Sequence, residues 1–173
     1  MEKKEFIETV NYWMEKVVRD TDFEFYSVTD VTINTRARRW MGRCRKHTIF
    51  GVVDWCKLDF AAALLQMDND SILNTILHEI AHTVVGSNGH DLLWWKAVNT
   101  FSHLYGVKIG QYASQEETVK LHQFSSRWVI KCKHCGATWE RFTKSSIVKG
   151  CLKGRCTCGC GSHEFDVQHI EGV

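Results

Sequence analysis

The sequence predicts an α+β fold in which about three helices pack around a small β-sheet and a second, smaller β module follows. Three observations indicate this. Apolar residues recur at helical spacing in three separate stretches. Between the first two of these lie segments rich in β-branched and aromatic residues, which favour strands. Six of the eight cysteines occur after residue 130, where we expect a separate metal-binding module.

The first predicted helix spans residues 3–19, because its apolar residues fall on one face and its Glu and Lys residues on the other. Residues 23–33 and 48–55 are rich in β-branched and aromatic side chains, so we expect short strands of one sheet there. No stretch reaches eighteen consecutive apolar residues, and the first twenty residues are charged throughout. We therefore expect a soluble cytoplasmic protein without a signal peptide and without membrane contacts.

The second predicted helix spans residues 71–85 and contains the sequence H-E-I-A-H. Polar residues around Ser71 can cap its start, and Gly86 can end it. His78 and His82 are four positions apart and lie on the same face of a helix, where two imidazoles can bind one metal ion. This stretch is the strongest functional motif in the chain.

A third ligand is needed, because a catalytic zinc site has three protein ligands and one position for water. The first glutamate after Glu79 is Glu116, which lies beyond the next helix and is a poor candidate. His90 is the best candidate, because Gly89 allows the chain to fold back onto the same ion. Asp91 is the alternative, although its position also suits the first turn of the following helix.

Glu79, next to His78, is the candidate catalytic residue. We expect its carboxylate beside the metal rather than on it, where it can take a proton from a metal-bound water as a general base. A Lewis acid and an activated water together favour hydrolysis of a peptide carbonyl. The predicted activity is therefore that of a zinc-dependent metallopeptidase.

The third predicted helix begins near Leu92 and ends before Gly106, a residue suited to the position after a helix. Residues 107–125 are polar and mixed, and we expect a linker there. This division places a metalloprotease domain in residues 1–120 and a zinc-binding domain in residues 121–173.

The second domain begins with a zinc knuckle, in which two residues separate Cys132 from Cys135. A second group of cysteines follows about twenty residues later, a spacing typical of a zinc ribbon. We expect Cys160 and Cys158 as the other two ligands, with Cys156 as the alternative to Cys158. Four thiolates leave no open coordination position, so this zinc is expected to be structural.

The second domain is also the basic part of the chain. Residues 120–173 contain nine Lys/Arg and four Asp/Glu, whereas residues 1–119 contain 13 and 16. Basic side chains can contact phosphates, and Trp128 and Trp139 can stack on unpaired bases, so we expect DNA contacts. The candidate residues for these contacts are basic side chains of this module: Lys131, Lys133, Arg141 and Lys144. The alternative is a purely structural module whose lysines serve solubility.

The string HEIAHTVVGSNGHDLLWW at residues 78–95 resembles the metalloprotease core of the SprT-like (Spartan) family. The upstream segments NTRARRWMGRC and TIFGVVDWCKLDF resemble the paired strands before the motif helix of that family, and the cysteine module resembles the zinc ribbon of many of its members. The resemblance implies a zincin-like core, three histidine ligands, a catalytic glutamate and a protease that attacks proteins near or crosslinked to DNA. The weak-suppressor-type proteases, which share H-E-x-x-H with a nearer third histidine, are the close alternative.

Two functions remain open on the sequence alone. The first is a monomeric zinc metalloendopeptidase that holds one catalytic and one structural Zn²⁺ and hydrolyses proteins associated with DNA or crosslinked to it. The second is a non-catalytic, zinc-containing nucleic-acid-binding module, in which both zinc ions are structural. Glu79 distinguishes the two, because a structural site has no use for a carboxylate beside the metal.

Overall fold

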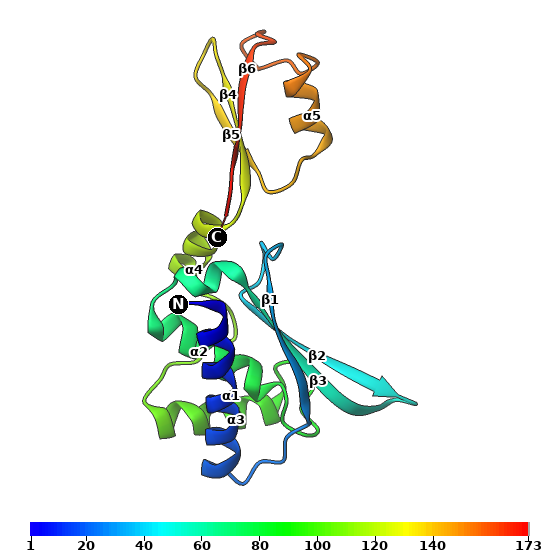
Figure 1. Cartoon of the computed structure of the whole chain (residues 1–173), viewed down its shortest axis with the longest axis vertical. Coiled ribbons are helices and arrows are strands. Elements are labelled where there is room, and N and C mark those ends of the chain that lie inside the picture. Colours follow the sequence, from blue (N-terminus) through cyan, green and yellow to red (C-terminus); the bar gives the residue numbers. More distant parts are fainter. Residues whose placement is uncertain (173) are drawn as a thin grey trace. The chain divides into compact units, whose positions relative to one another are not determined.

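The computed structural model of the chain describes residues 1–172. These residues form two compact units, and the boundary between them lies between His122 and Gln123. Helices and two separate small sheets are both present, so the predicted α+β class is confirmed. Figure 1 labels the helices and strands of both units. Within the described residues, no helix is both long and apolar enough to span a membrane.

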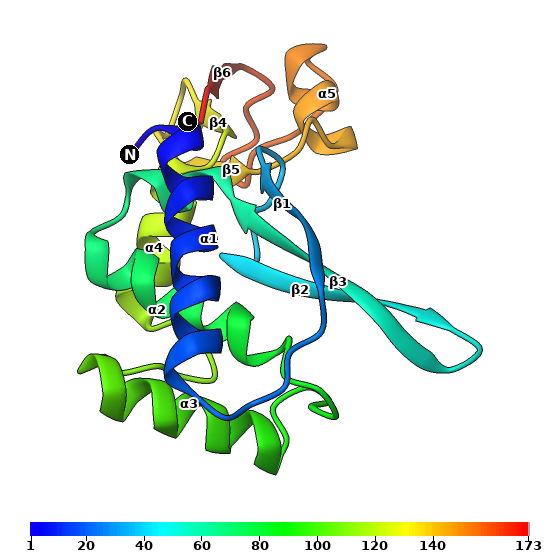
Figure 2. The same ribbon diagram turned by 60° about the horizontal axis from the view of Figure 1, so that its bottom comes forward.

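The first unit is built on a three-stranded sheet in the order β1-β3-β2. Its central strand, β3 (Val52–Ala61), runs parallel to β1 (Val28–Asn34) and antiparallel to β2 (Gly42–Ile49). β2 is therefore an edge strand. Strands β2 and β3 form a hairpin that projects beyond the helices (Figure 2). Its tip is the pair Phe50 and Gly51, both with positive φ (50° and 82°), as a tight two-residue hairpin turn requires.

Three helices lie beside this sheet: the first two pack against its strands, and the third packs on the second (Figures 1 and 2). They are α1 (Lys3–Asp20), α2 (Asn69–Ala81) and α3 (Leu92–Tyr105), and a short 3-10 turn, η1 (Ala62–Gln66), leads from β3 toward α2. The apolar face of α1 is buried against the sheet. Phe6 of α1 is fully buried and packs edge-to-face on Phe60 of β3, with ring centroids 5.1 Å apart.

Helix α2 ends earlier than the sequence predicts. The periodic apolar residues suggest a helix up to residue 85, but the last helical residue is Ala81 and His82 is the C-cap. The next residues instead bond to the strand-like segment before β1: the Tyr26 amide donates to the Thr83 carbonyl (2.8 Å), and the Val85 amide donates to the Glu24 carbonyl (2.8 Å). Tertiary pairing thus replaces the last helical turn.

The predicted linker is also wrong in its second half. Residues Gln115–Phe124 form helix α4, in which Leu121 is buried. Lys120 of this helix pairs with Asp68 (2.9 Å) and with Glu116 (3.1 Å). The sequence signal is weak because α4 buries few apolar side chains.

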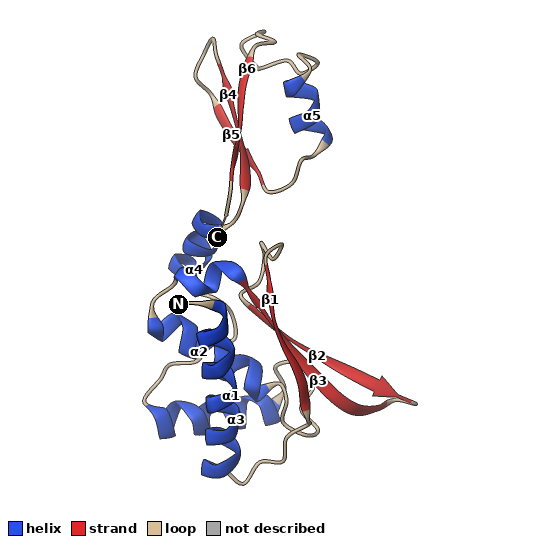
Figure 3. Cartoon of the chain, viewed as in Figure 1, coloured by secondary structure: helices blue, strands red, loops and turns tan. Residues whose placement is uncertain are grey.

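The second unit contains the antiparallel sheet β5-β4-β6, formed by β4 (Arg127–Cys132), β5 (Thr138–Arg141) and β6 (Phe165–Ile170). The expected all-β module is wrong in one respect, because a helix, α5 (Ser146–Leu152), packs on one face of this sheet (Figure 3). The Ser145 hydroxyl caps α5 by accepting from the Val148 amide. Three side chains form the core of this unit: Ile130, Val148 and Cys151.

Candidate functional site

Three imidazoles converge at the end of α2. His78 lies in the last turn of this helix, His82 is its C-cap, and His90 immediately precedes Asp91, the N-cap of α3. The Nε2 atom of His78 is 3.2 Å from Nε2 of His82 and 3.2 Å from Nε2 of His90. All three ligand nitrogens lie within 4.8 Å of one another.

This arrangement fits a tetrahedral metal ion. Ligand nitrogens bound at roughly 2.0–2.1 Å to a tetrahedral zinc lie about 3.3 Å from each other, close to the observed spacing. Burial lowers the pKa of His82 to about 3 and also lowers the pKa values of His78 and His90. The imidazoles are therefore neutral at pH 7, which is the form that binds a metal.

The short loop between α2 and α3 brings His90 back to the helix. Gly86 and Gly89 have φ values of 83° and 62°, a backbone conformation that side chains with a Cβ disfavour. Asp91, the alternative third ligand, is used otherwise. Its carboxylate accepts from the amides of Trp94 (2.9 Å) and Asn88 (2.8 Å), so it caps α3 and closes the loop.

An indole forms the floor of the histidine cluster. Trp94 is fully buried, and its ring centroid lies 4.9, 5.5 and 4.5 Å from those of His78, His82 and His90. Trp94 belongs to the core and also supports the three imidazoles.

The segment after α3, which we expected to be a linker, forms another wall of the site. His78 Nδ1 is 2.9 Å from the carbonyl oxygen of Gly110, and the side-chain amide nitrogen of Gln111 is 3.3 Å from His90 Nδ1. The ring of Tyr112 lies 6.1 Å from that of His90. Sequence reasoning missed these residues, because a backbone carbonyl has no side-chain signature and neither Gln111 nor Tyr112 belongs to a periodic pattern.

Glu79 is buried between α2 and the edge strand β2. Its side chain lies against Gly42, and the backbone N–H of Cys44 is a hydrogen-bond donor to its carboxylate. Burial raises the pKa of Glu79 to about 8. Together with His78, Glu79 lines a cavity of about 750 Å³, whose other lining residues include Trp40 and Tyr112.

The second unit holds a second candidate metal group. The sulfur atoms of Cys132 and Cys160 are 3.6 Å apart, those of Cys135 and Cys158 are 3.5 Å apart, and all four lie within 4.8 Å of one another. Thiolates at roughly 2.3 Å from a tetrahedral zinc would be about 3.8 Å apart, so a metal ion fits here too. Cys156 lies outside this group, and its thiol donates to the Ile147 carbonyl (3.5 Å).

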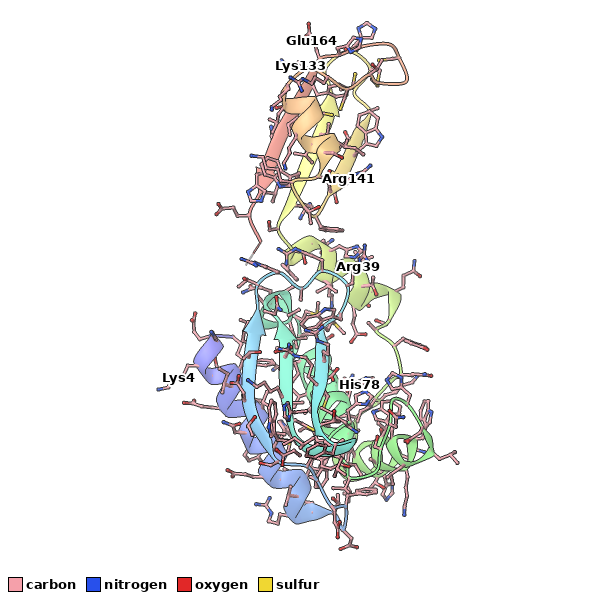
Figure 4. The ribbon with its side chains drawn as sticks, turned by 90° about the vertical axis from the view of Figure 1, so that its right-hand side faces the viewer. Lys4, Arg39, His78, Lys133, Arg141 and Glu164 are labelled. Carbon is pink, nitrogen blue, oxygen red and sulfur yellow. The ribbon has the colours of Figure 1, made fainter. Side chains whose placement is uncertain are left out.

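The four basic residues that we expect to contact DNA do not share one surface. Arg141 is paired with Trp128 across the sheet and lies on the α5 face, where Lys144 Nζ is 5.1 Å from the Trp128 ring centroid. Lys131 alternates with buried Ile130 and lies on the opposite face. Lys133 lies beside Glu164, at the other end of the strands from Arg141 (Figure 4).

The fold and the site define an α+β protein with a three-imidazole candidate metal site and a buried carboxylate beside it (Figure 4 labels His78). The SprT-like family model matches residues 10–113, and the chain belongs to the SprT-like family. The matched range contains the three histidines, Glu79 and the loop up to Tyr112, and it ends before the cysteine group. A search among curated proteins finds no match.

Proposed function

We propose that this chain is a zinc-dependent metallopeptidase with a zincin-like core, and that its substrates are proteins associated with DNA or crosslinked to it. One observation carries the proposal: three imidazole nitrogens converge beside the buried Glu79 at the wall of a large cavity. Membership of the SprT-like family supports it. We further propose that the chain acts as a monomer in the cytoplasm.

His78, His82 and His90 would hold the zinc through their Nε2 atoms. When bound there, zinc supplies a Lewis acid for the scissile carbonyl and lowers the pKa of water. Two of the imidazoles also form hydrogen bonds with the backbone: His78 bonds to the Gly110 carbonyl, and His82 bonds to the Gly89 backbone. Such outer contacts fix the ring orientation and the tautomer of a ligand histidine.

Glu79 would act as the general base and then as the general acid. Its carboxylate lines the cavity, so a water or a peptide nitrogen in the cavity can reach it. Burial raises the pKa of Glu79, which makes its carboxylate a stronger base and lets the carboxyl group hold the proton until it is returned to the leaving amine. The Cys44 amide and the bare backbone at Gly42 keep this side chain in one place.

The cavity beside the site is suited to an extended peptide. Its lining continues from His78 along α2 to Asn74 and Ser71. Asn74 lines this stretch, and its Oδ1 atom is buried without a hydrogen-bond partner among the described residues. Trp40 also lines the cavity, and Arg43 supports it by lying over its ring at 4.6 Å.

For the second unit we propose a zinc ribbon with Cys132, Cys135, Cys158 and Cys160 as ligands. A four-thiolate site is closed, so its zinc would stabilise the unit and take no part in catalysis. DNA contacts would use the α5 face, where Arg141, Lys144 and the half-buried Trp128 lie together. Lys131 and Lys133, which point elsewhere, would contribute less.

The test compares wild type with Glu79→Gln, each with and without single-stranded DNA, at matched zinc content. We expect wild type to cleave a DNA-bound protein substrate, with a higher rate when DNA is present. Glu79→Gln should retain two zinc ions and lose turnover by about 1,000-fold or more. Full activity of Glu79→Gln would refute the mechanism, and zinc binding without any cleavage by wild type would favour a non-catalytic nucleic-acid-binding module.

A further inference from the structure

Each of the three imidazoles has a second contact, made by the ring nitrogen that does not face the other two histidines. The kind of group that makes this contact differs among the three. His78 and His82 face backbone groups, those of Gly110 and Gly89. His90 instead faces a side-chain amide, that of Gln111, at 3.3 Å from Nδ1. The same amide group lies 3.2 Å from the hydroxyl of Tyr112.

The chemistry of a ligand histidine decides which atom of Gln111 must face it. A neutral imidazole that binds a metal through Nε2 carries its proton on Nδ1, so Nδ1 is a donor. An amide nitrogen is also a donor, and two donors at 3.3 Å do not form a hydrogen bond. The oxygen and nitrogen of a glutamine amide exchange places when the group turns by half a revolution, and the hydrogen-bond network decides between them.

We infer that Gln111 is a positioning residue of the metal site, whose amide oxygen accepts from His90 Nδ1–H and from the Tyr112 hydroxyl. In this orientation both neighbours donate and one carbonyl oxygen, with two lone pairs, accepts from both. Gln111 thereby does for His90 what the Gly110 carbonyl does for His78. The inference rests on the proposed function, because it assumes that His90 binds zinc through Nε2.

The contact matters more for His90 than for the other two ligands. His78 and His82 are fixed by α2, whereas His90 lies on the loop before α3 and is held by no helical backbone. Loss of an outer hydrogen bond to a ligand histidine typically weakens metal binding by roughly 10–100-fold. We expect an effect in this range at Gln111.

Two substitutions at position 111 separate an acceptor from a donor. Gln111→Glu keeps the shape and offers only oxygen atoms, so it should bind zinc at the three-histidine site at least as tightly as wild type. Gln111→Leu removes the acceptor and should weaken zinc affinity at that site by about 10-fold or more. Tyr112→Phe should have a smaller effect, and none when combined with Gln111→Leu, because the two residues act through one atom.

Zinc dissociation constants are measured on the full chain by chelator competition. The ion lost in a His82→Ala reference identifies the histidine site, and cobalt–thiolate absorption identifies the cysteine site. Gln66→Leu is the matched control, since Gln66 is an exposed glutamine at the end of η1. Circular dichroism checks that every variant folds.

The outcomes distinguish the inference from the function on which it rests. If Gln111→Leu binds zinc as tightly as wild type, Gln111 is not a positioning residue. If Gln111→Glu binds as weakly as Gln111→Leu, the amide acts as a donor and the assigned orientation is wrong. If wild type and the His82→Ala reference bind the same number of zinc ions, the histidine site itself fails, and the proposed function fails with it.

Discussion

Gly42 of β2 lies directly against Glu79 of α2. A Cβ atom added at Gly42 would be 2.5 Å from Cγ and 2.7 Å from Oε1 of the glutamate, closer than real atoms approach. The backbone of Gly42 has an ordinary conformation, so the lack of a side chain is needed for space and not for φ. The edge strand thus sets the position of the carboxylate.

Gly42→Ala should therefore displace Glu79 without disturbing the three histidines. A catalytic group moved by about 1 Å can cost roughly 100-fold in rate, so we expect a loss of that order in kcat with unchanged zinc content. Steady-state kinetics and metal analysis measure both. The double variant Gly42→Ala/Glu79→Gln is the control: it should be no slower than Glu79→Gln alone, and additive losses would show that Gly42 acts elsewhere.

The two cysteines that compete for one ligand position predict different zinc contents. Cys158→Ser removes a sulfur from the four-thiolate group, so the chain should lose one zinc ion and the second unit should become sensitive to protease. Cys156→Ser should keep both ions, because that thiol bonds to the Ile147 carbonyl instead. Metal analysis with limited proteolysis checks this, and the reverse pattern would assign Cys156 as the ligand.

Because of the ion pairs of Asp59, we expect the fold to lose stability at low pH. This buried carboxylate of β3 pairs with Arg45 (2.6 Å) and Arg43 (3.1 Å) and accepts from the Thr32 hydroxyl. Burial opposes its ionisation, but the hydrogen bonds from Thr32, Arg45 and Arg43 outweigh burial and lower the pKa of Asp59. A carboxyl group with a lowered folded-state pKa stabilises the fold above its unfolded pKa, about 3.9, and loses this contribution as the pH falls through the folded pKa.

Asp59→Asn should accordingly lower the free energy of unfolding at pH 7 by about 2 kcal/mol. The difference from wild type should shrink as the pH falls below about 4, because wild type then loses the same interactions. Urea denaturation at pH 7 and at lower pH measures this difference. A difference that stays constant down to acid pH would show that packing, and not the charge, accounts for the loss.

The two faces of the second unit predict different effects on DNA affinity. Lys144→Glu places a negative charge over Trp128 on the α5 face and should weaken binding of single-stranded DNA by about 10-fold at moderate salt. Lys131→Glu makes the same charge change on the opposite face and should have little effect. Fluorescence anisotropy at two salt concentrations compares them. Equal losses for both variants would indicate a diffuse electrostatic contact instead of a face.

Much of the fold follows from local sequence patterns. The predicted bounds of α1 and α3 differ from the observed ones by at most one residue, because a one-sided apolar pattern defines α1 and Gly106 ends α3 in the left-handed conformation. The end of α2 could not be predicted. Residues 82–85 continue the helical pattern, and only the backbone pairing with Glu24 and Tyr26 ends the helix at Ala81.

Part of the candidate site could also be predicted from local sequence patterns, and part of it could not. The spacing of His78, His82 and His90 contains the information needed to bring them together, because one helix and one glycine-rich loop connect them. The loop with Gly110 and Gln111 reaches the site from the far end of α3, and its contacts depend on the packing of that helix against α2. No local pattern in residues 107–114 reports such a contact.

The placement of Trp94 under the three imidazoles has a practical consequence. An indole in van der Waals contact with every ligand senses whatever ion they hold, so its emission should report occupancy of the site directly. A paramagnetic ion such as Co²⁺ should quench it, whereas Zn²⁺ should only shift it. The chain contains seven tryptophans, so the signal of Trp94 is the difference in emission between wild type and Trp94→Phe, and this difference should follow the filling of the histidine site without any label.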